Sequence, residues 1–337
     1  MMEYVNLGRT GVKVSRICLG AWGFGNEAEW MINKEQARPI IKRAMDLGVN
    51  FFDTADSYSQ GLSEEILGEI LSPYRSDVIL ATKVGLSFGH GPNSEGLSRS
   101  RIQKQLAGSL SRLRTQYIDL FQMHRWDYSV PIEEILSAMT DSIKMGKVTY
   151  LGVSSMYAWQ LSHMIDTAAS KGFESPVSIQ PRYNLIYREE EREMIPLCRE
   201  LGLGIIPYSP LARGFLTGKY KINSNPDRPR YRSDKTLQSH YSSEVDHEIV
   251  ETVLELSKEK GVEPSQISLA WLYNKPWITS PIIGVTKVGH VDKAVEALDV
   301  KLGSDDIKRL EEGYTPHPVF WQQELNSNIP DWFHNQG

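Results

Sequence analysis

The chain has 337 residues, of which 40% are hydrophobic and 23% are charged, so it contains enough apolar material for a large core. A formal net charge of -5 and the lack of basic runs argue against nucleic acid and membrane surfaces as partners. Its only cysteines, Cys18 and Cys198, provide neither a disulfide framework nor a metal cluster, so no metal is expected.

The amino-terminal residues also restrict the class of protein. They lack the charged and apolar regions of a secretory signal, and no apolar run in the chain approaches about 18 residues. We therefore expect a cytoplasmic protein that does not span a membrane. The sequence does not indicate an oligomeric state.

Strand-like apolar runs recur along the chain. Residues 4–7 and 12–14 flank a turn with two glycines, which predicts a β-hairpin within residues 1–15. Eight further runs have the length and composition of buried strands. They lie at residues 17–19, 49–52, 78–81, 118–123, 150–153, 177–179, 204–208 and 278–283.

Amphipathic segments with helical spacing alternate with these runs. They lie at residues 33–47, 63–71, 98–113, 131–145, 157–170, 189–201 and 292–298. Alternating strands and helices imply a parallel sheet with right-handed crossovers. Eight such units favour a closed (β/α)8 TIM barrel over a doubly wound open sheet, and barrels of this length commonly form one domain. We expect that domain to cover residues 1–337.

Two regions depart from the alternation. Residues 209–243, after the seventh strand, are rich in Gly, Pro, Ser, Asn and Arg, which predicts a long loop; loops of this length are usually functional or disordered. Extra helices are expected at 244–259, 264–274 and 305–312. The tail at 314–337 contains Phe320, Trp321, Trp332 and Phe333, and we expect it to pack over the barrel mouth, with disorder as the alternative.

Polar or small residues follow the end of every predicted strand. In chain order they are Gly20 to Trp22, Asp53, Thr82 and Lys83, His124, Ser154 and Ser155, Gln180, Tyr208 and Ser209, and Thr286 and Lys287. In a barrel these ends meet at one face, where active sites are built. Each residue alone has a structural explanation, such as a solvated lysine or a core histidine. Eight on one rim favour a single site.

These residue types suit the reduction of a carbonyl. Tyr58, five residues after Asp53, can act as a general acid if a nearby ammonium lowers the pKa of its phenol. Lys83 can supply that charge, and Asp53 can keep Lys83 protonated. His124 can donate a hydrogen bond that orients the carbonyl. Two electrons are still required, and a nicotinamide would provide them.

The sequence resembles an aldo-keto reductase over essentially its whole length. Residues 53–58 are similar to the family's Asp-Thr-Ala-x-x-Tyr segment, and Lys83 and His124 match its active-site lysine and histidine. Residues 152–155 and 208–219 resemble its nicotinamide and pyrophosphate segments. Stretches at 124–127, 155–159 and 187–193 look most like the microbial branch related to aryl-alcohol dehydrogenases and versiconal hemiacetal acetate reductase.

The resemblance implies NADPH or NADP+ as cofactor and a small-molecule carbonyl compound as substrate. The cofactor residues that it implies are Trp22, Ser154, Ser155, Gln180, Tyr208, Ser209, Pro210, Leu211, Arg213, Gly214, Lys219, Gly284, Thr286, Lys287 and His290. Trp22, Arg125 and Trp126 are expected to contact the substrate. The turn at 284–289, before a helix expected to start at His290, is suited to bind the phosphate that distinguishes NADPH from NADH.

Departures from the family pattern leave alternatives open. Ser155 stands where many relatives have asparagine, and Lys293 and Ala294 replace a Glu-Asn pair near the adenosine end. Glycines between residues 20 and 25 do not have Rossmann spacing. A Schiff-base aldolase or isomerase would use Lys83 as its nucleophile, and a nicotinamide-binding regulatory subunit would need no catalysis.

Overall fold

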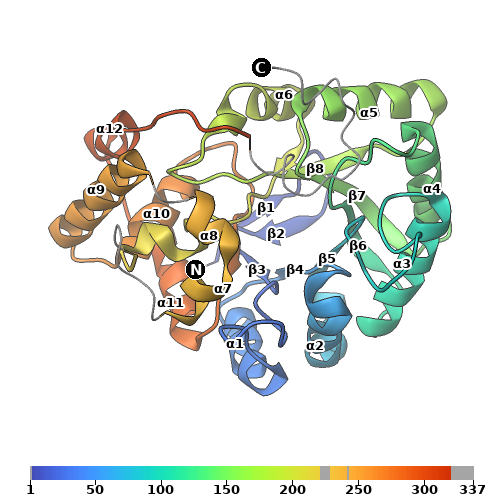
Figure 1. Cartoon of the computed structure of the whole chain (residues 1–337), viewed down its shortest axis with the longest axis horizontal. Helices are drawn as coiled ribbons and strands as arrows, with labels where there is room; N and C mark the ends of the chain where they lie inside the picture. Colours follow the sequence, from blue (N-terminus) through green and yellow to red (C-terminus); the bar gives the residue numbers. More distant parts are fainter. Residues whose placement is uncertain (1, 221–227, 241–242, 320–337) are drawn as a thin grey trace.

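A sheet of eight parallel strands forms the centre of the computed structural model, which describes residues 2–220, 228–240 and 243–319 (Figure 1). The strands follow one another around the sheet in the order β10, β3, β4, β5, β6, β7, β8, β9. They are β3 (Cys18–Gly20), β4 (Phe51–Asp53), β5 (Ile79–Val84), β6 (Ile118–Met123), β7 (Val148–Ser154), β8 (Pro176–Gln180), β9 (Gly204–Ile205) and β10 (Ile282–Gly284). All eight predicted strands are confirmed.

The sheet closes on itself between its last two strands. The amide of Ile282 donates to the carbonyl of Pro207 at 2.8 Å, and the amide of Thr279 donates to Ile205 at 2.9 Å. On its other side β10 pairs in parallel with β3. The structure is therefore the predicted (β/α)8 TIM barrel.

Helices cover the outside of the strands (Figure 1). They are α1 (Lys34–Asp46), α2 (Leu62–Leu71), α3 (Arg99–Arg112), α4 (Ile132–Lys144), α5 (Ala158–Lys171), α6 (Met194–Leu201) and α11 (Val288–Glu296). Local signals fix many of their ends, since Asn33 forms a capping box at α1 and Gly172 ends α5 in the left-handed conformation. The predicted start of α11 at His290 is wrong, because Lys287 already serves as its N-cap.

The predicted hairpin, β1 (Tyr4–Asn6) and β2 (Lys13–Ser15), packs against the amino-terminal end of the barrel. Its Leu7 and Val14 are fully buried and join the apolar residues that fill the barrel interior. Those interior residues include Cys18, Phe51, Ala81, Leu120, Ile206 and Ile282. Side chains therefore fill the amino-terminal half, and polar groups lie at the carboxyl ends of the strands.

The prediction of one irregular loop over residues 209–243 is wrong in part. The segment contains a 3₁₀ stretch, Ala212–Thr217, and two short helices, α7 (Pro229–Ser233) and α8 (Lys235–His240). Asp234 caps α8, because its carboxylate accepts from the amide of Leu237 at 3.1 Å, and Leu237 is buried in the main core. The burial of Leu237 is a tertiary contact, whereas the composition of the segment is that of a loop. Residues 221–227 and 241–242 lie outside the described residues.

The remaining helices are α9 (Glu244–Lys260), α10 (Pro264–Tyr273) and α12 (Ser304–Glu312), close to their predicted positions. After α12, the hydroxyl of Tyr314 accepts from the amide of Arg188 at 2.9 Å, which ties this segment to the region after β8. The tail aromatics predicted to cover the mouth, from Phe320 onward, lie outside the described residues. Within the described part of the chain, every helix is too short or too polar to cross a bilayer.

Candidate active site

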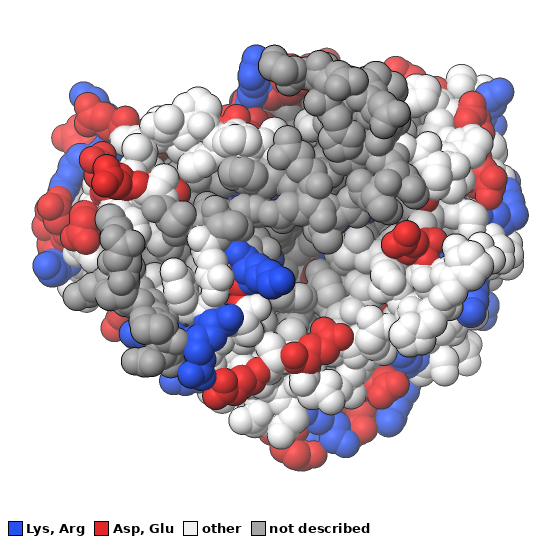
Figure 2. All heavy atoms as spheres, viewed as in Figure 1, with Lys and Arg blue, Asp and Glu red and all other residues white. Residues whose placement is uncertain are grey.

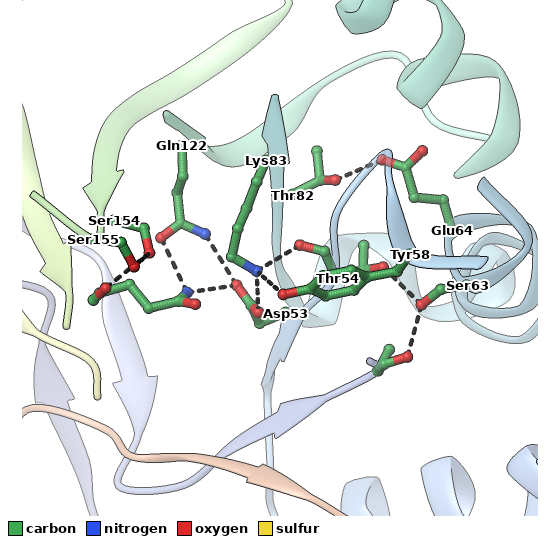
Figure 3. A network of polar contacts seen from close by, with 12 residues as sticks. Asp53, Thr54, Tyr58, Ser63, Glu64, Thr82, Lys83, Gln122, Ser154 and Ser155 are labelled. Carbon is green, nitrogen blue, oxygen red and sulfur yellow. Dashed lines mark hydrogen bonds and ion pairs between the residues drawn. The ribbon is translucent and has the colours of Figure 1, made fainter. Parts of the chain in front are cut away.

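Lys83 lies at the centre of a polar cluster at the carboxyl ends of the strands (Figure 3). Its ammonium donates to Asp53 Oδ1 at 2.5 Å, to the carbonyl of Thr54 at 2.8 Å and to the hydroxyl of Tyr58 at 3.2 Å. The lysine side chain is fully buried. The structure therefore brings together the acid, the ammonium and the phenol that the sequence predicted to act together.

Two amides hold the other carboxylate oxygen of Asp53. Gln122 Nε2 and Gln180 Nε2 each donate to Asp53 Oδ2 at 2.9 Å. These charge-assisted bonds stabilise the ionised carboxylate away from water. Sequence reasoning missed Gln122 because it lies inside an apolar run, but it precedes His124 by two residues and so points to the same face of β6.

The charge of Lys83 survives its burial. Burial lowers the pKa of this ammonium, but attraction to Asp53 and Tyr58 outweighs that effect and raises the pKa above its ordinary value. Lys83 is therefore protonated at neutral pH. A protonated amine is not a nucleophile, so the pairing with Asp53 disfavours imine formation at Lys83.

The phenol of Tyr58 does not have the lowered pKa that the sequence predicted. Burial raises the pKa of Tyr58, Lys83 lowers it and Asp53 raises it again, so that it lies above the ordinary value. The predicted sign was wrong because spacing along the chain does not reveal how deeply a phenol is buried. Tyr58 consequently keeps its proton near neutral pH, which is the form that a general acid requires.

His124 follows β6 and faces Tyr58. Its amide donates to the carbonyl of Val84 at 2.9 Å, and its ring meets the Tyr58 ring edge-on at 5.7 Å between centroids. Burial, then Lys83 and Arg125, hold the pKa of His124 well below its ordinary value. The imidazole is therefore neutral, and its Nδ1 has no hydrogen-bond partner among the described residues.

The turn that carries Tyr58 has a strained backbone. Ser59 and Gln60 adopt left-handed conformations with φ of 48° and 49°, and Gly61 follows at 90°. Side chains brace the turn from within: the hydroxyls of Thr54 and Ser63 lie 2.8 Å apart. Non-glycine residues keep such conformations only where the surrounding structure imposes them, and such strain is frequent at functional sites.

The residues predicted to bind the nicotinamide gather beside Asp53. The Ser154 hydroxyl donates to the carbonyl of Gln180 at 2.8 Å, and the Ser155 hydroxyl donates to the hydroxyl of Tyr208 at 3.5 Å. Ser155 has a left-handed backbone, with φ of 47°. A single polar network thus joins the ends of β7 and β8 to the catalytic candidates (Figure 3).

The segment after β9 forms a cradle of left-handed residues. Ser209, Ala212, Arg213 and Gly214 have φ of 53°, 47°, 57° and 93°. A Cβ placed on Gly214 would lie 2.6 Å from the ammonium of Lys219, and its φ of 93° is one that residues with a side chain rarely adopt. The predicted cofactor residues Pro210 and Leu211 are part of this segment.

The side chains of Arg213 and Trp22 contact each other. The guanidinium of Arg213 lies 4.6 Å from the Trp22 ring centroid and also donates to both carboxylate oxygens of Asp234, at 2.8 and 3.0 Å. Arg230 lies 5.3 Å from the same ring. Trp22, predicted to line the substrate site, therefore packs against two arginines of the segment after β9.

A group of cations lies where the phosphate site was predicted. Although part of Lys219 is exposed to solvent, burial of its ammonium and repulsion from Arg230, Arg228 and Lys287 lower its pKa to about 8. Burial and the charges of Lys219 and Lys287 likewise lower the pKa of His290. Such an excess of positive charge favours the binding of an anion.

The other predicted phosphate residues lie beside this group. Gly284 ends β10 in register with Gly20, and a Cβ on Gly23 would lie 3.8 Å from the methyl of Thr286. Basic side chains flank a hollow near the middle of the face shown in Figure 2. This concentration of basic side chains suits an anionic ligand.

The predicted substrate residues after β6 differ in their surroundings. Trp126 is buried in an aromatic cluster, with ring centroids 6.4 Å from Tyr128 and 5.9 Å from Trp159. Trp159 is half exposed. Arg125 lies close enough to His124 for its charge to lower the histidine pKa. Trp126 and Tyr128 follow His124 closely in the chain, on the segment after β6.

Comparisons with known proteins agree with this geometry. The model of the aldo/keto reductase family matches residues 16–314. Versiconal hemiacetal acetate reductase of Aspergillus parasiticus is 38% identical over 94% of this chain and 98% of the relative. Putative aryl-alcohol dehydrogenases of Schizosaccharomyces pombe and Saccharomyces cerevisiae are 37% and 38% identical, over 94% of this chain and 97% and 98% of the relatives.

Proposed function

Because the chain belongs to the aldo/keto reductase family, a family of oxidoreductases, we propose that it uses NADPH to reduce an aldehyde or ketone to the alcohol, reversibly. The observation that carries this proposal is the contact between Lys83 and Tyr58 at 3.2 Å, with Lys83 also bound to Asp53. A protonated phenol beside a permanent cation can donate its proton as negative charge develops on a substrate oxygen.

The chain's own residues would divide the work as follows. The nicotinamide, when bound, supplies the hydride. Tyr58 transfers its hydroxyl proton to the carbonyl oxygen, and Lys83 stabilises the phenolate that remains. Asp53 keeps Lys83 charged and aimed. The neutral His124 donates a hydrogen bond to the same oxygen and so orients the carbonyl.

The cation group supports the phosphorylated cofactor over NADH. Besides burial, the charges of Arg230, Arg228 and Lys287 lower the pKa of Lys219, and those of Lys219 and Lys287 lower the pKa of His290. A ribose phosphate or pyrophosphate would counter this excess of positive charge. The left-handed cradle at 212–214 would let backbone approach the pyrophosphate closely. Ser154, Ser155 and Gln180 would hold the nicotinamide amide, and Tyr208 its ring.

We infer that aromatic aldehydes are better substrates than short aliphatic ones. Trp126, Tyr128 and Trp159 form an aromatic cluster, and two of its members follow His124 closely in the chain. Two of the relatives above are named as putative aryl-alcohol dehydrogenases, and aromatic side chains suit an aryl ring.

Absorbance of the reduced cofactor in the near ultraviolet tests the function directly. The purified protein should oxidise NADPH when aromatic aldehydes are added, and omission of the aldehyde should stop the reaction. No oxidation with any aldehyde or ketone would refute the proposal. A borohydride-trapped adduct on Lys83 would instead support the Schiff-base alternative, which the raised pKa of Lys83 disfavours.

Cofactor choice is tested at Lys287. We expect Lys287→Ala to weaken NADPH binding by at least severalfold and to leave NADH binding nearly unchanged, because a charge-assisted hydrogen bond contributes roughly 1.5–3 kcal/mol. Titrations that follow intrinsic tryptophan fluorescence give both affinities. Equal weakening of the two cofactors, or a wild type that prefers NADH, would contradict the phosphate site.

A further inference from the structure

A second buried charged cluster lies behind the turn that carries Tyr58, between β5 and the helices α2 and α3. Its carboxylates are Asp56 and Glu64, which are completely buried, and its cations are Arg101 and Arg112 of α3. Two acids and two arginines balance in charge. None of these side chains is needed by the catalytic steps above, so their burial calls for another explanation.

Arg101 links the turn after β4 to the loop after β5. It forms a long ion pair with Asp56 Oδ2 at 3.9 Å and donates to the carbonyls of Leu86 at 3.2 Å and Phe88 at 3.5 Å. Gln105, oriented to satisfy both neighbours, donates to Asp56 Oδ2 at 3.2 Å and accepts from Arg101 at 2.6 Å. One arginine thus holds both the segment before Tyr58 and the loop that follows Lys83.

The other half of the cluster holds the far end of the turn. Glu64 accepts from the Thr82 hydroxyl at 2.5 Å and from Arg112 Nε at 2.7 Å (Figure 3). Arg112 packs on Gly61, since a Cβ at that glycine would lie 2.7 Å from the arginine Cδ. Thr82 precedes Lys83 in β5. The turn is therefore fixed on both sides of Tyr58 to the strand that carries Lys83.

We propose that Asp56 is a positioning residue for carbonyl reduction, whose carboxylate, bound by Arg101 and Gln105, sets the position of Tyr58 relative to Lys83. The proposal rests on the proposed function, in which Tyr58 is the proton donor. A strained turn needs external contacts to keep one conformation, and a displacement of about 1 Å at a reacting group can cost up to about a hundredfold in rate.

The charge of Asp56 changes near neutral pH. Burial and repulsion from Glu64 raise the pKa of Asp56 to about 7, whereas Arg101 and Arg112 lower it. These are the charged groups that face it from α2 and α3. Protonation removes the attraction to Arg101, so the tie between turn and helix should be strongest above pH 7 and weakest below it.

The test compares Asp56→Asn with wild type across pH. Asparagine resembles the protonated acid, so we expect kcat to be nearly equal in the two proteins at about pH 6 and about tenfold lower in the variant at about pH 9, with NADPH affinity within about twofold throughout. A role in stability alone would lower the melting temperature and leave a ratio of kcat values that does not vary with pH. A flat ratio would overturn the proposal.

Asp119 offers a matched control. It is a buried aspartate near the start of β6, bound to Arg75 at 2.6 Å and to the amide of Leu80 at 2.9 Å, at the opposite end of the barrel wall. Asp119→Asn should lower stability and leave kcat unchanged at every pH. If Asp119→Asn reproduces the pH-dependent ratio of Asp56→Asn, the positioning role is refuted.

Two further variants separate the possible failures. If Asp56→Asn does not fold, Gln105→Met keeps both charges, removes only the bridging amide and should still lower kcat about threefold above pH 7; an unchanged kcat would refute the role. A wild type that reduces no carbonyl compound would refute the proposed function itself. An active wild type, an inactive Tyr58→Phe and a fully active Asp56→Asn would refute only the role of Asp56.

Discussion

Tyr58 combines a raised pKa with a neighbouring cation, and this pairing suits a donor that must release its proton late. The phenol keeps its proton because its pKa is raised, and the ammonium of Lys83, 3.2 Å from the hydroxyl, can stabilise the phenolate once the proton has been transferred. Replacing this tyrosine by phenylalanine removes the proton and little volume. We expect Tyr58→Phe to lower kcat by about a hundredfold or more and to leave NADPH affinity within about twofold.

Steady-state kinetics with an aromatic aldehyde and a fluorescence titration of NADPH check this expectation together. Loss of cofactor binding along with turnover would indicate a damaged site rather than a missing proton. Turnover within about tenfold of wild type would rule out Tyr58 as the proton donor.

Lys219 gives the cofactor site its own pH dependence. With a pKa of about 8 in the free protein, it is protonated below that pH and neutral above it. A bound phosphate favours the ammonium form and raises this pKa, so NADPH affinity should be constant below about pH 8 and fall by at most about tenfold per pH unit above it.

Fluorescence titrations between about pH 7 and about pH 10 measure this slope, and Lys219→Met should remove it. Calorimetry at about pH 8.5, in two buffers with different heats of ionisation, should show proton uptake on binding to wild type and less uptake in the variant. NADPH affinity that does not vary with pH would place the phosphates away from Lys219.

The sequence identified those site residues whose positions follow from strand ends. Asp53, Lys83 and His124 each end a predicted strand, and in a parallel barrel that position brings them to one face. Gln122 was missed because its neighbours are apolar. The pKa direction of Tyr58 was wrong because it depends on burial, which arises from tertiary packing.

At the scale of elements, the turn between β4 and α2 has a strained backbone at Gly61 and packs tightly against Arg112 at the same residue. Gly61 has φ of 90°, and an added Cβ would lie 2.7 Å from Arg112. We expect Gly61→Ala to reduce the free energy of unfolding by about 2 kcal/mol or more and also to lower kcat, because the same change displaces Tyr58.

Gly146 is the matched control for this substitution. Its φ of 65° is also left-handed, but a Cβ there would meet no heavy atom within 4 Å. Gly146→Ala should therefore cost only about 1 kcal/mol of backbone strain and leave kcat unchanged. Urea denaturation and kinetics on both variants make the comparison. Equal losses of stability and activity would show that contact with Arg112 has no effect.

Local patterns predicted the order of strands and helices but not the structure after β9. Alternating apolar runs and amphipathic segments identified the eight strands, because each element carries its own periodicity. The short helices α7 and α8 escaped detection, since Asp234 and Leu237 stabilise them through contacts distant in sequence. The glycine, proline and arginine residues of this segment give it the composition of a loop, so local sequence patterns predicted no helices there.

At the scale of the whole molecule, the hairpin adds to the core of the barrel without taking part in the site. Leu7 is fully buried among residues of the barrel interior, at the end remote from Tyr58. Leu7→Ala should reduce the free energy of unfolding by about 2–5 kcal/mol, since it leaves a cavity in a packed interior. Below the unfolding temperature its kcat should match wild type.

Thermal unfolding and assays at low temperature separate these two effects. A large loss of kcat in folded Leu7→Ala would mean that the two ends of the barrel are coupled. The barrel architecture could be predicted from the eight repeated units of strand and helix. The depth to which the hairpin inserts into the barrel could not, because it depends on Gly8, where an added Cβ would lie 2.6 Å from the carbonyl of Val177.

Among the described residues, side chains fill the amino-terminal half of the barrel, which leaves the carboxyl-terminal face as the route to the strand ends. If the proposed reaction occurs at the strand ends, the alcohol must leave by the route through which the next aldehyde arrives. Binding of the aldehyde and release of the alcohol then cannot occur at the same time, so the turnover rate depends on how fast the alcohol leaves. At high alcohol concentration, the alcohol would therefore compete with the aldehyde for access to the site. The closed amino-terminal end of the barrel thus determines how substrate and product exchange at the carboxyl-terminal end.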